Sequence, residues 1–175
     1  MHHPIIQLAA VAMRDGEQVG QFEAKLQFNP GHCDTKALAI NRFAAQDWEL
    51  AEEPPIVCQK FAKFLEPFKT IEKISKAGKP YKVACLAGYN AAIFDAPRLQ
   101  KLFSDHQIFL PADYKVLDVF QLALWFFEVN PEGKPESLKL SSVCNYFGVK
   151  LENAHDALAD CIATAQLTEK LLCRS

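Results

Sequence analysis

Two aspartates and one histidine have the types and positions that metal-assisted hydrolysis needs. Asp95 comes shortly after an apolar segment, Asp160 lies near the start of the last amphipathic segment, and His155 precedes Asp160 by five residues. Carboxylate oxygens are the ligands that Mg²⁺ prefers, and an imidazole beside them is a suitable base for an attacking water. In the structural alternative, Asp95 and Asp156 cap helices and His155 is an ordinary surface residue. Spacing alone favours this alternative, because Asp is a preferred cap residue.

The pattern of apolar residues predicts the elements that must position these side chains. An apolar run at 5–13, a polar turn and an alternating segment at 21–28 predict an antiparallel hairpin. Residues 81–87 are predicted to form a buried strand, which ends at Gly88. Apolar residues at helical spacing predict helices at 56–68, 96–103, 118–128, 137–146 and 157–172. The sequence therefore predicts one α/β unit with a hairpin at its beginning and helices in its second half.

Length and composition limit the function classes. The chain has 175 residues, 50% of them hydrophobic and 23% charged, which suffices for the core of a single domain and excludes intrinsic disorder. The formal net charge of −2 creates no global attraction to nucleic acid or membranes, so nucleic-acid binding has to be local. No apolar run approaches the roughly 20 residues of a membrane span. Six cysteines form no C-x-x-C pair, so free thiols and a cytoplasmic location are expected.

Two sequence motifs, which occur here in the same order as in a known protein family, favour the metal site over the structural alternative. Residues 155–160 (His-Asp-Ala-Leu-Ala-Asp) resemble the third motif of the DEDDh 3′ to 5′ exonucleases, the DnaQ-like branch of the ribonuclease H-like superfamily. Residues 87–95 (Ala-Gly-Tyr-Asn-Ala-Ala-Ile-Phe-Asp) resemble the second motif, and residues 118–123 and 138–148 resemble segments between the two. The resemblance implies a ribonuclease H-like α/β fold over 1–175, with a central mixed sheet, an antiparallel hairpin and flanking helices.

The resemblance also implies an activity and its residues. A family member releases nucleoside 5′-monophosphates from the 3′ ends of single-stranded DNA or RNA, with two Mg²⁺ or Mn²⁺ ions. Asp95 and Asp160 take the positions of metal ligands, and His155 that of the base. The substrate-binding positions fall on Asn90, Phe94 and Tyr89. Tyr89 replaces the more usual His, and both base stacking and plain packing remain open for it. A DNA polymerase subunit is a second candidate partner.

One family motif has no match in this sequence. The first motif, an Asp-x-Glu on the first strand, precedes the segment that 5–13 resembles, and only 1–4 stand before it here. We therefore expect the first central strand to be missing, an N-terminally truncated domain, and little or no activity in this chain alone. The alternative is a noncatalytic module that binds nucleic acid or a polymerase. Asp15 and Glu17 have the Asp-x-Glu pattern of the first motif. Their place in the hairpin turn argues against them as substitutes for its two carboxylates.

A basic stretch is the remaining candidate for substrate contact. It either contacts phosphates or forms a solvated helix face, and the second account is favoured on general grounds. Its lysines are Lys60, Lys63, Lys69, Lys73, Lys76, Lys79 and Lys82.

Overall fold

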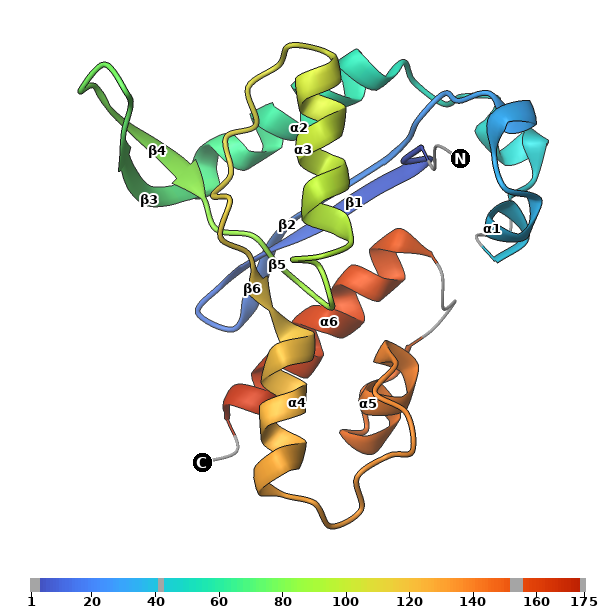
Figure 1. Cartoon of the computed structure of the whole chain (residues 1–175), viewed down its shortest axis with the longest axis vertical. Coiled ribbons are helices and arrows are strands. Elements are labelled where there is room, and N and C mark those ends of the chain that lie inside the picture. The colour runs from blue at the N-terminus through green and yellow to red at the C-terminus, as the bar shows by residue number, and fades with distance from the viewer. Residues whose placement is uncertain (1–3, 41–42, 152–155, 174–175) are drawn as a thin grey trace.

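The predicted hairpin opens the chain. The computed structural model describes residues 4–40, 43–151 and 156–173, and Figure 1 shows the arrangement of its elements. Strand β1 (Gln7–Arg14) pairs antiparallel with β2 (Glu17–Lys25). Asp15 and Gly16 make the turn with φ of 52° and 81°, in the left-handed region that Asp and Gly tolerate best.

Helix α2 (Pro54–Leu65) follows the crossing segment, residues 26–53, and hydrogen bonds join the end of this segment to the end of β2. The Glu52 amide donates to the Lys25 carbonyl (2.9 Å), and the Gln27 amide donates to the Glu52 carbonyl (2.8 Å). The crossing segment holds short helices, namely η1 (Pro30–His32), α1 (Thr35–Ile40) and η2 (Ala45–Trp48).

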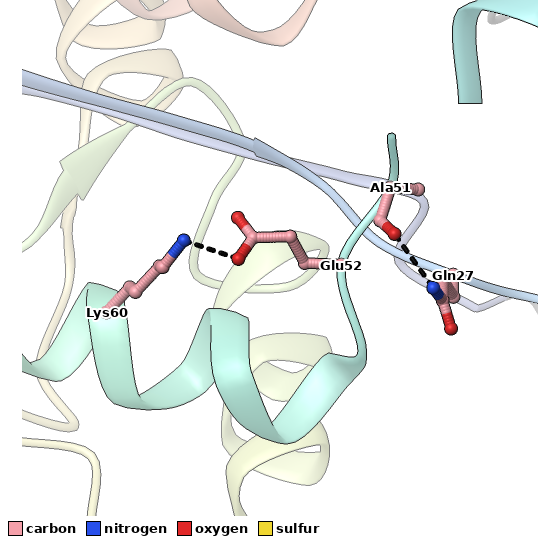
Figure 2. A network of polar contacts seen from close by, with 4 residues as sticks. All are labelled: Gln27, Ala51, Glu52 and Lys60. Atoms are coloured by element: carbon pink, nitrogen blue, oxygen red, sulfur yellow. Dashed lines mark hydrogen bonds and ion pairs between the residues drawn. The ribbon is translucent and has the colours of Figure 1, made fainter. Parts of the chain in front are cut away.

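Side chains strengthen the same junction, as Figure 2 shows. The Gln27 side-chain amide donates to the Ala51 carbonyl (2.9 Å), and Lys60 on α2 forms an ion pair with Glu52. These contacts hold the start of α2 beside the hairpin, where Val57 and Leu26 are fully buried. The helix then ends in the turn η3 (Glu66–Phe68).

A second hairpin corrects the expectation of a helix face for the part of the basic stretch at 69–82, whereas Lys60 and Lys63 do lie on helix α2. Strand β3 (Lys69–Ile74) pairs antiparallel with β4 (Pro80–Ala84), and both lie within the lysine-rich segment. The hairpin projects from the body of the molecule (Figure 1). Ile71 and Ile74 stand three residues apart, a spacing that suits a helix, but pairing with β4 decides the structure here.

A short parallel pair and four helices complete the fold. Strand β5 (Ala87–Gly88) pairs with β6 (Leu117–Asp118). The helices agree with the predicted segments to within a few residues, and the last agrees at both ends. They are α3 (Asp95–Asp105), α4 (Val119–Val129), α5 (Leu140–Tyr146) and α6 (Ala157–Leu172).

The apolar side chains gather in two main clusters. One lies between α4, α5 and α6 and includes the buried Phe127 and Leu167. The other lies between α2, α3 and the strands and includes Phe61 and Phe103, whose rings contact edge to face. No helix among the described residues is long and apolar enough to cross a membrane.

The strands do not join into one continuous central sheet in the described part of the chain. They form three two-stranded sheets, in which β1 pairs only with β2, and β5 only with β6. The segment 81–87 is correspondingly less buried than predicted: Val83 and Ala84 are buried, whereas Tyr81, Cys85 and Ala87 are exposed.

Candidate active site

The turn between β5 and α3 carries four of the six predicted site residues. Gly88 begins it, and a Cβ added there would lie 2.6 Å from the Cβ of Ala91, so the backbone can approach this closely only at a glycine. Asn90 has a φ of 59°, a left-handed conformation that Asn accepts more readily than most residues. The turn is therefore tightly constrained, and it ends at Asp95, in the first turn of α3.

Asp118 holds this turn in place from another part of the chain. Its Oδ1 accepts from the amides of Asn90 (2.9 Å) and Phe120 (3.0 Å), and its Oδ2 accepts from the amide of Ala92 (3.0 Å). The same carboxylate is the N-cap of α4. Sequence reasoning placed Asp118 only in a segment between motifs. An Asp before a strongly apolar helix does predict a cap, but the two contacts to the turn cannot be read from spacing.

Tyr89 is held by the protein itself. Its hydroxyl donates to the Leu138 carbonyl (2.5 Å), and its ring meets Phe120 edge to face at a centroid distance of 5.7 Å. Burial, with smaller effects from Cys144 and Asp118, raises the pKa of Tyr89 to about 12. These contacts support the packing account, and a contact between Tyr89 and substrate stays a prediction.

Phe94 and Arg98 form an exposed pair beside Asp95. The Arg98 guanidinium carbon lies 3.7 Å from the centre of the Phe94 ring, and its Nη1 donates to the Phe94 carbonyl (2.7 Å). The Phe94 side chain is 54% exposed. An exposed ring at this place can stack on a base, while the cation behind it can attract a phosphate. Sequence reasoning missed Arg98, which stands one helical turn after Phe94.

Asp95 and Asp160 come from distant parts of the chain and act on each other electrostatically. Burial of the carboxyl group raises the pKa of Asp95, and the charges of Asp118 and Asp160 raise it further, whereas Arg98 opposes the shift. Asp95 is nevertheless among the exposed residues, so this burial is partial. Both aspartates lie in the first turn of a helix, where the helix dipole favours a negative charge.

The first turn of α6 is anchored to β1. Asp156 is the N-cap and accepts from the amide of Ala159 (3.0 Å), as the structural alternative expected of it. The Gln7 side chain donates to Asp156 (3.2 Å), and the Cys161 thiol donates to the Ala9 carbonyl (3.4 Å). This carbonyl on the outer edge of β1 thus accepts from a side chain on α6. His155, the predicted base, lies outside the described residues.

The thiol of Cys161 is kept protonated by the same surroundings. Burial raises its pKa to about 12, with further contributions from Asp95, Asp160 and Asp156. A thiol with so high a pKa is a poor nucleophile and a poor metal ligand at neutral pH, because both roles need the thiolate. The chemistry of this site therefore rests on its carboxylates.

The described residues supply only part of a metal site. Asp95 and Asp160 have the oxygen donors that Mg²⁺ prefers, but no three His, Cys, Asp or Glu side chains in 4–40, 43–151 and 156–173 come together to hold an ion. Asp118 lies near enough to affect Asp95, yet its oxygens are already occupied by three amides. These residues do not by themselves make a two-ion site.

Asp15 and Glu17 do not complete this set. Gly16, which lies between them, is next to Glu169 on α6: an added Cβ would be 3.7 Å from the Glu169 Oε1. Glu169 is nine residues after Asp160 on the same helix, about 13 Å along its axis at about 1.5 Å per residue. The hairpin turn therefore lies toward the far end of α6 (Figure 1).

Comparisons with known proteins agree with these observations. Residues 1–168 match the model of the family RNase_T, described as exonuclease. The PolC-type DNA polymerase III of Latilactobacillus sakei is 30% identical over 171 residues, which are 98% of this chain and 10% of that protein. The chain thus spans about a tenth of this relative.

Solved structures show the same fold at low sequence identity. Two structures of exonuclease I, one of them the E. coli enzyme in complex with a dT13 oligonucleotide, each match with a TM-score of 0.74 and 20% identity, over 95% of this chain and 36% of that one. Cell-death related nuclease 4 matches with a TM-score of 0.70 and 12% identity, over 95% of this chain and 56% of that one. The fold is ribonuclease H-like, and the chain belongs to the RNase_T exonuclease family.

Proposed function

We propose that this chain is the exonuclease domain of a 3′ to 5′ exonuclease that releases nucleoside 5′-monophosphates from single-stranded DNA or RNA ends. The observation that carries the proposal is that Asp95 and Asp160, in the first turns of two different helices, lie near enough for the charge of Asp160 to raise the pKa of Asp95. Membership of an exonuclease family supports the hydrolysis of nucleic acid. The direction of cleavage rests on the motif resemblance at 87–95 and 155–160.

The residues of this chain have separate roles in the proposed site. Phe94, stacked on Arg98, presents an exposed ring to a terminal base. Asn90 lies in the turn fixed by Asp118, and we propose that it contacts the same nucleotide. His155 is proposed as the base that takes a proton from the attacking water, on the evidence of the sequence motif alone.

The residues of this chain supply some, but not all, of the ligands that two divalent ions would need. Exonucleases of this family use divalent metal ions, and exonuclease I has been solved with zinc and single-stranded DNA. Asp95 and Asp160 have the oxygen donors that Mg²⁺ or Mn²⁺ prefer. Two carboxylates are, however, fewer ligands than two ions need. We therefore propose two-ion catalysis only for a form in which an Asp-x-Glu pair joins them, and little or no activity without it.

We propose the edge of β1 that faces away from β2 as the place where a strand carrying such a pair would add. The Ala9 carbonyl, on the edge of β1 that faces away from β2, accepts from the Cys161 thiol rather than from a strand. Cys161 is adjacent to Asp160 on α6, and β5 leads directly into the turn that ends at Asp95. We propose that a strand which replaced the Cys161 thiol as the partner of this edge would bring its side chains toward both aspartates.

The test is Mn²⁺-dependent degradation of a 3′-labelled single strand. It compares this chain, a version extended by a strand carrying Asp-x-Glu, and the extended version with Asp160→Asn. Asp15→Asn in the extended version is the matched control, because it removes an equivalent carboxylate from the hairpin turn. We expect cutting by the extended chain and its Asp15→Asn variant, and none from the Asp160→Asn variant.

Two outcomes would contradict this proposal. Cutting by the unextended chain that Asp15→Asn abolishes would mean that the hairpin turn completes the site. An extended chain that binds single strands but never cuts them would support the second candidate, a noncatalytic module that binds nucleic acid or a polymerase.

The relative suggests the setting in which the domain works. The matching protein of Latilactobacillus sakei is a PolC-type DNA polymerase III. We propose that this domain also acts beside a DNA polymerase, in the cytoplasm. Co-purification of the chain with a polymerase subunit from its own host tests the association, and its absence in a pull-down at low salt would contradict it.

A further inference from the structure

One face of the β3–β4 hairpin gathers aromatic rings and lysines. Lys73 stands directly opposite Tyr81 in the register of the two strands, so both side chains lie on the same face. The Tyr81 ring meets Phe109 edge to face at 6.1 Å, and the Lys73 Nζ lies 5.0 Å from the centre of the Tyr114 ring. We call these residues, together with Lys115, the Tyr81 face.

The rings of the Tyr81 face are open to solvent. Phe109 is 63% exposed, Tyr114 is 70% exposed and Tyr81 is 39% exposed. Large apolar side chains scattered singly over a surface need no explanation, but a contiguous exposed group marks a binding surface. Exposed aromatic rings are the groups on which bases of a single strand stack.

Charge adds a second property to this surface. Residues 69–82 and 109–115 hold six lysines against two acids, in a chain whose net charge is −2. The buried Asp113 forms an ion pair with Lys73 (2.9 Å) and thereby fixes it over Tyr114, while the Lys115 Nζ lies 5.9 Å from the same ring. Lys76 and Lys79 are exposed near the hairpin tip.

We infer that the Tyr81 face binds single-stranded nucleic acid, with bases stacked on Phe109 and Tyr114 and phosphates contacted by Lys115 and the lysines of the hairpin tip. Exposed rings between cations are the combination that binds single strands without sequence preference. The inference rests on the proposed function for the class of ligand. It adds a contact surface outside the turn that holds Asp95.

The position of the Tyr81 face defines which part of the strand it binds. The chain runs from Tyr81 along β4 and β5 to Gly88, where the site turn begins, and the seven steps between these two residues span at most about 23 Å at about 3.3 Å per residue. The hairpin points away from α6 (Figure 1). A nucleic acid whose 3′ end lies near Asp95 would reach this face with nucleotides several positions upstream.

The experiment measures binding of fluorescein-labelled oligothymidylate by anisotropy, with EDTA present so that cutting plays no part. Single-strand surfaces cover about 4 to 16 nucleotides, so the probes are about 4 and about 20 nucleotides long. The test variant is Phe109→Ala with Tyr114→Ala. The matched control is Trp125→Ala, because Trp125 on α4 is equally exposed at 70%. Urea unfolding of each variant verifies that the fold is intact.

We expect the double variant to bind the long probe at least about 5-fold more weakly, because stacking of one base contributes about 5- to 150-fold in affinity. Binding of the short probe and of Trp125→Ala should stay unchanged. Lys115→Glu should weaken long-probe binding and flatten its salt dependence, whereas Lys170→Glu on α6 should do neither. Oligouridylate as a third probe distinguishes RNA from DNA.

The remaining outcomes distinguish a failure of the Tyr81 face from a failure of the proposed exonuclease function. Equal binding of the long probe by the double variant and by Trp125→Ala would overturn the Tyr81 face. So would binding of polyglutamate as tight as that of the long probe, because charge alone would then account for it. In another outcome, a strand-extended chain binds the long probe through these rings and yet never cuts it. That outcome would support the Tyr81 face and contradict the exonuclease function.

Discussion

The close approach at Gly88 provides the sharpest test of how the site turn is built. In Gly88→Ala the new Cβ would lie 2.6 Å from the Cβ of Ala91. Carbon atoms in contact prefer about 3.5 to 4.0 Å, so the two must separate by about 1 Å. Both atoms are attached directly to the backbone, and no side-chain rotation can relieve the contact. The turn that carries Asn90 therefore has to move.

The expected loss of stability is about 1 to 3 kcal/mol, the usual cost of overpacking. The upper end applies if the movement pulls the amide of Asn90 or Ala92 away from Asp118, because a hydrogen bond to a charged group contributes about 1.5 to 3 kcal/mol. Gly20→Ala is the matched control on β2. Its nearest atom would be Phe68 Cζ at 3.4 Å, an ordinary contact, so we expect a change within about 1 kcal/mol.

A second substitution isolates the contact itself. Ala91→Gly removes the clashing Cβ and leaves the Ala91 Cα at 4.0 Å as the nearest atom. Alone it should destabilise, because it removes a buried methyl group and adds backbone freedom. Combined with Gly88→Ala it should restore about 1 to 3 kcal/mol relative to the sum of the single effects.

Urea unfolding followed by circular dichroism gives these free energies, with the slope m checked for constancy. A Gly88→Ala variant with the unfolding midpoint of the wild-type chain would show that the close contact with Ala91 does not constrain the turn. Strict additivity of Gly88→Ala and Ala91→Gly would show that the loss of stability has another cause than this contact.

Three further predictions concern stability. Asp118→Ala should cost about 1 to 3 kcal/mol and Asp118→Asn less, since Asn keeps one acceptor oxygen; equal losses in urea unfolding would contradict this. Leu167→Ala, in the core and fully buried, should cost about 2 to 5 kcal/mol, against almost nothing for the exposed Leu172→Ala in the same helix. The hydrogen bond from Lys73 lowers the pKa of Asp113, so its stabilisation is present above the unfolded pKa of about 3.9 and is lost as pH falls through the lower folded value. In acid unfolding the advantage of the wild-type chain over Asp113→Asn should shrink below about pH 4, and a constant difference there would contradict the assignment.

Local sequence patterns determined the elements and the family. Side chains repeat with the period of the element that carries them, so the first hairpin and the helix Ala157–Leu172 could be predicted from the positions of apolar residues. The motifs likewise predicted Asp95 and Asp160 as site residues, because both lie within short segments of ordered spacing. Each of these inferences uses residues that are close in the chain.

Tertiary packing alone decided how the site is held and where the second surface lies. Asp118 fixes the turn across 28 residues of sequence, and Tyr89 reaches Leu138 across 49. Lys73 lies over Tyr114 only because β3 pairs with β4. The spacing of Ile71 and Ile74 by itself would also suit a helix. Such contacts leave no periodic trace in the sequence, since they depend on which distant backbone groups the folded chain brings within hydrogen-bonding distance.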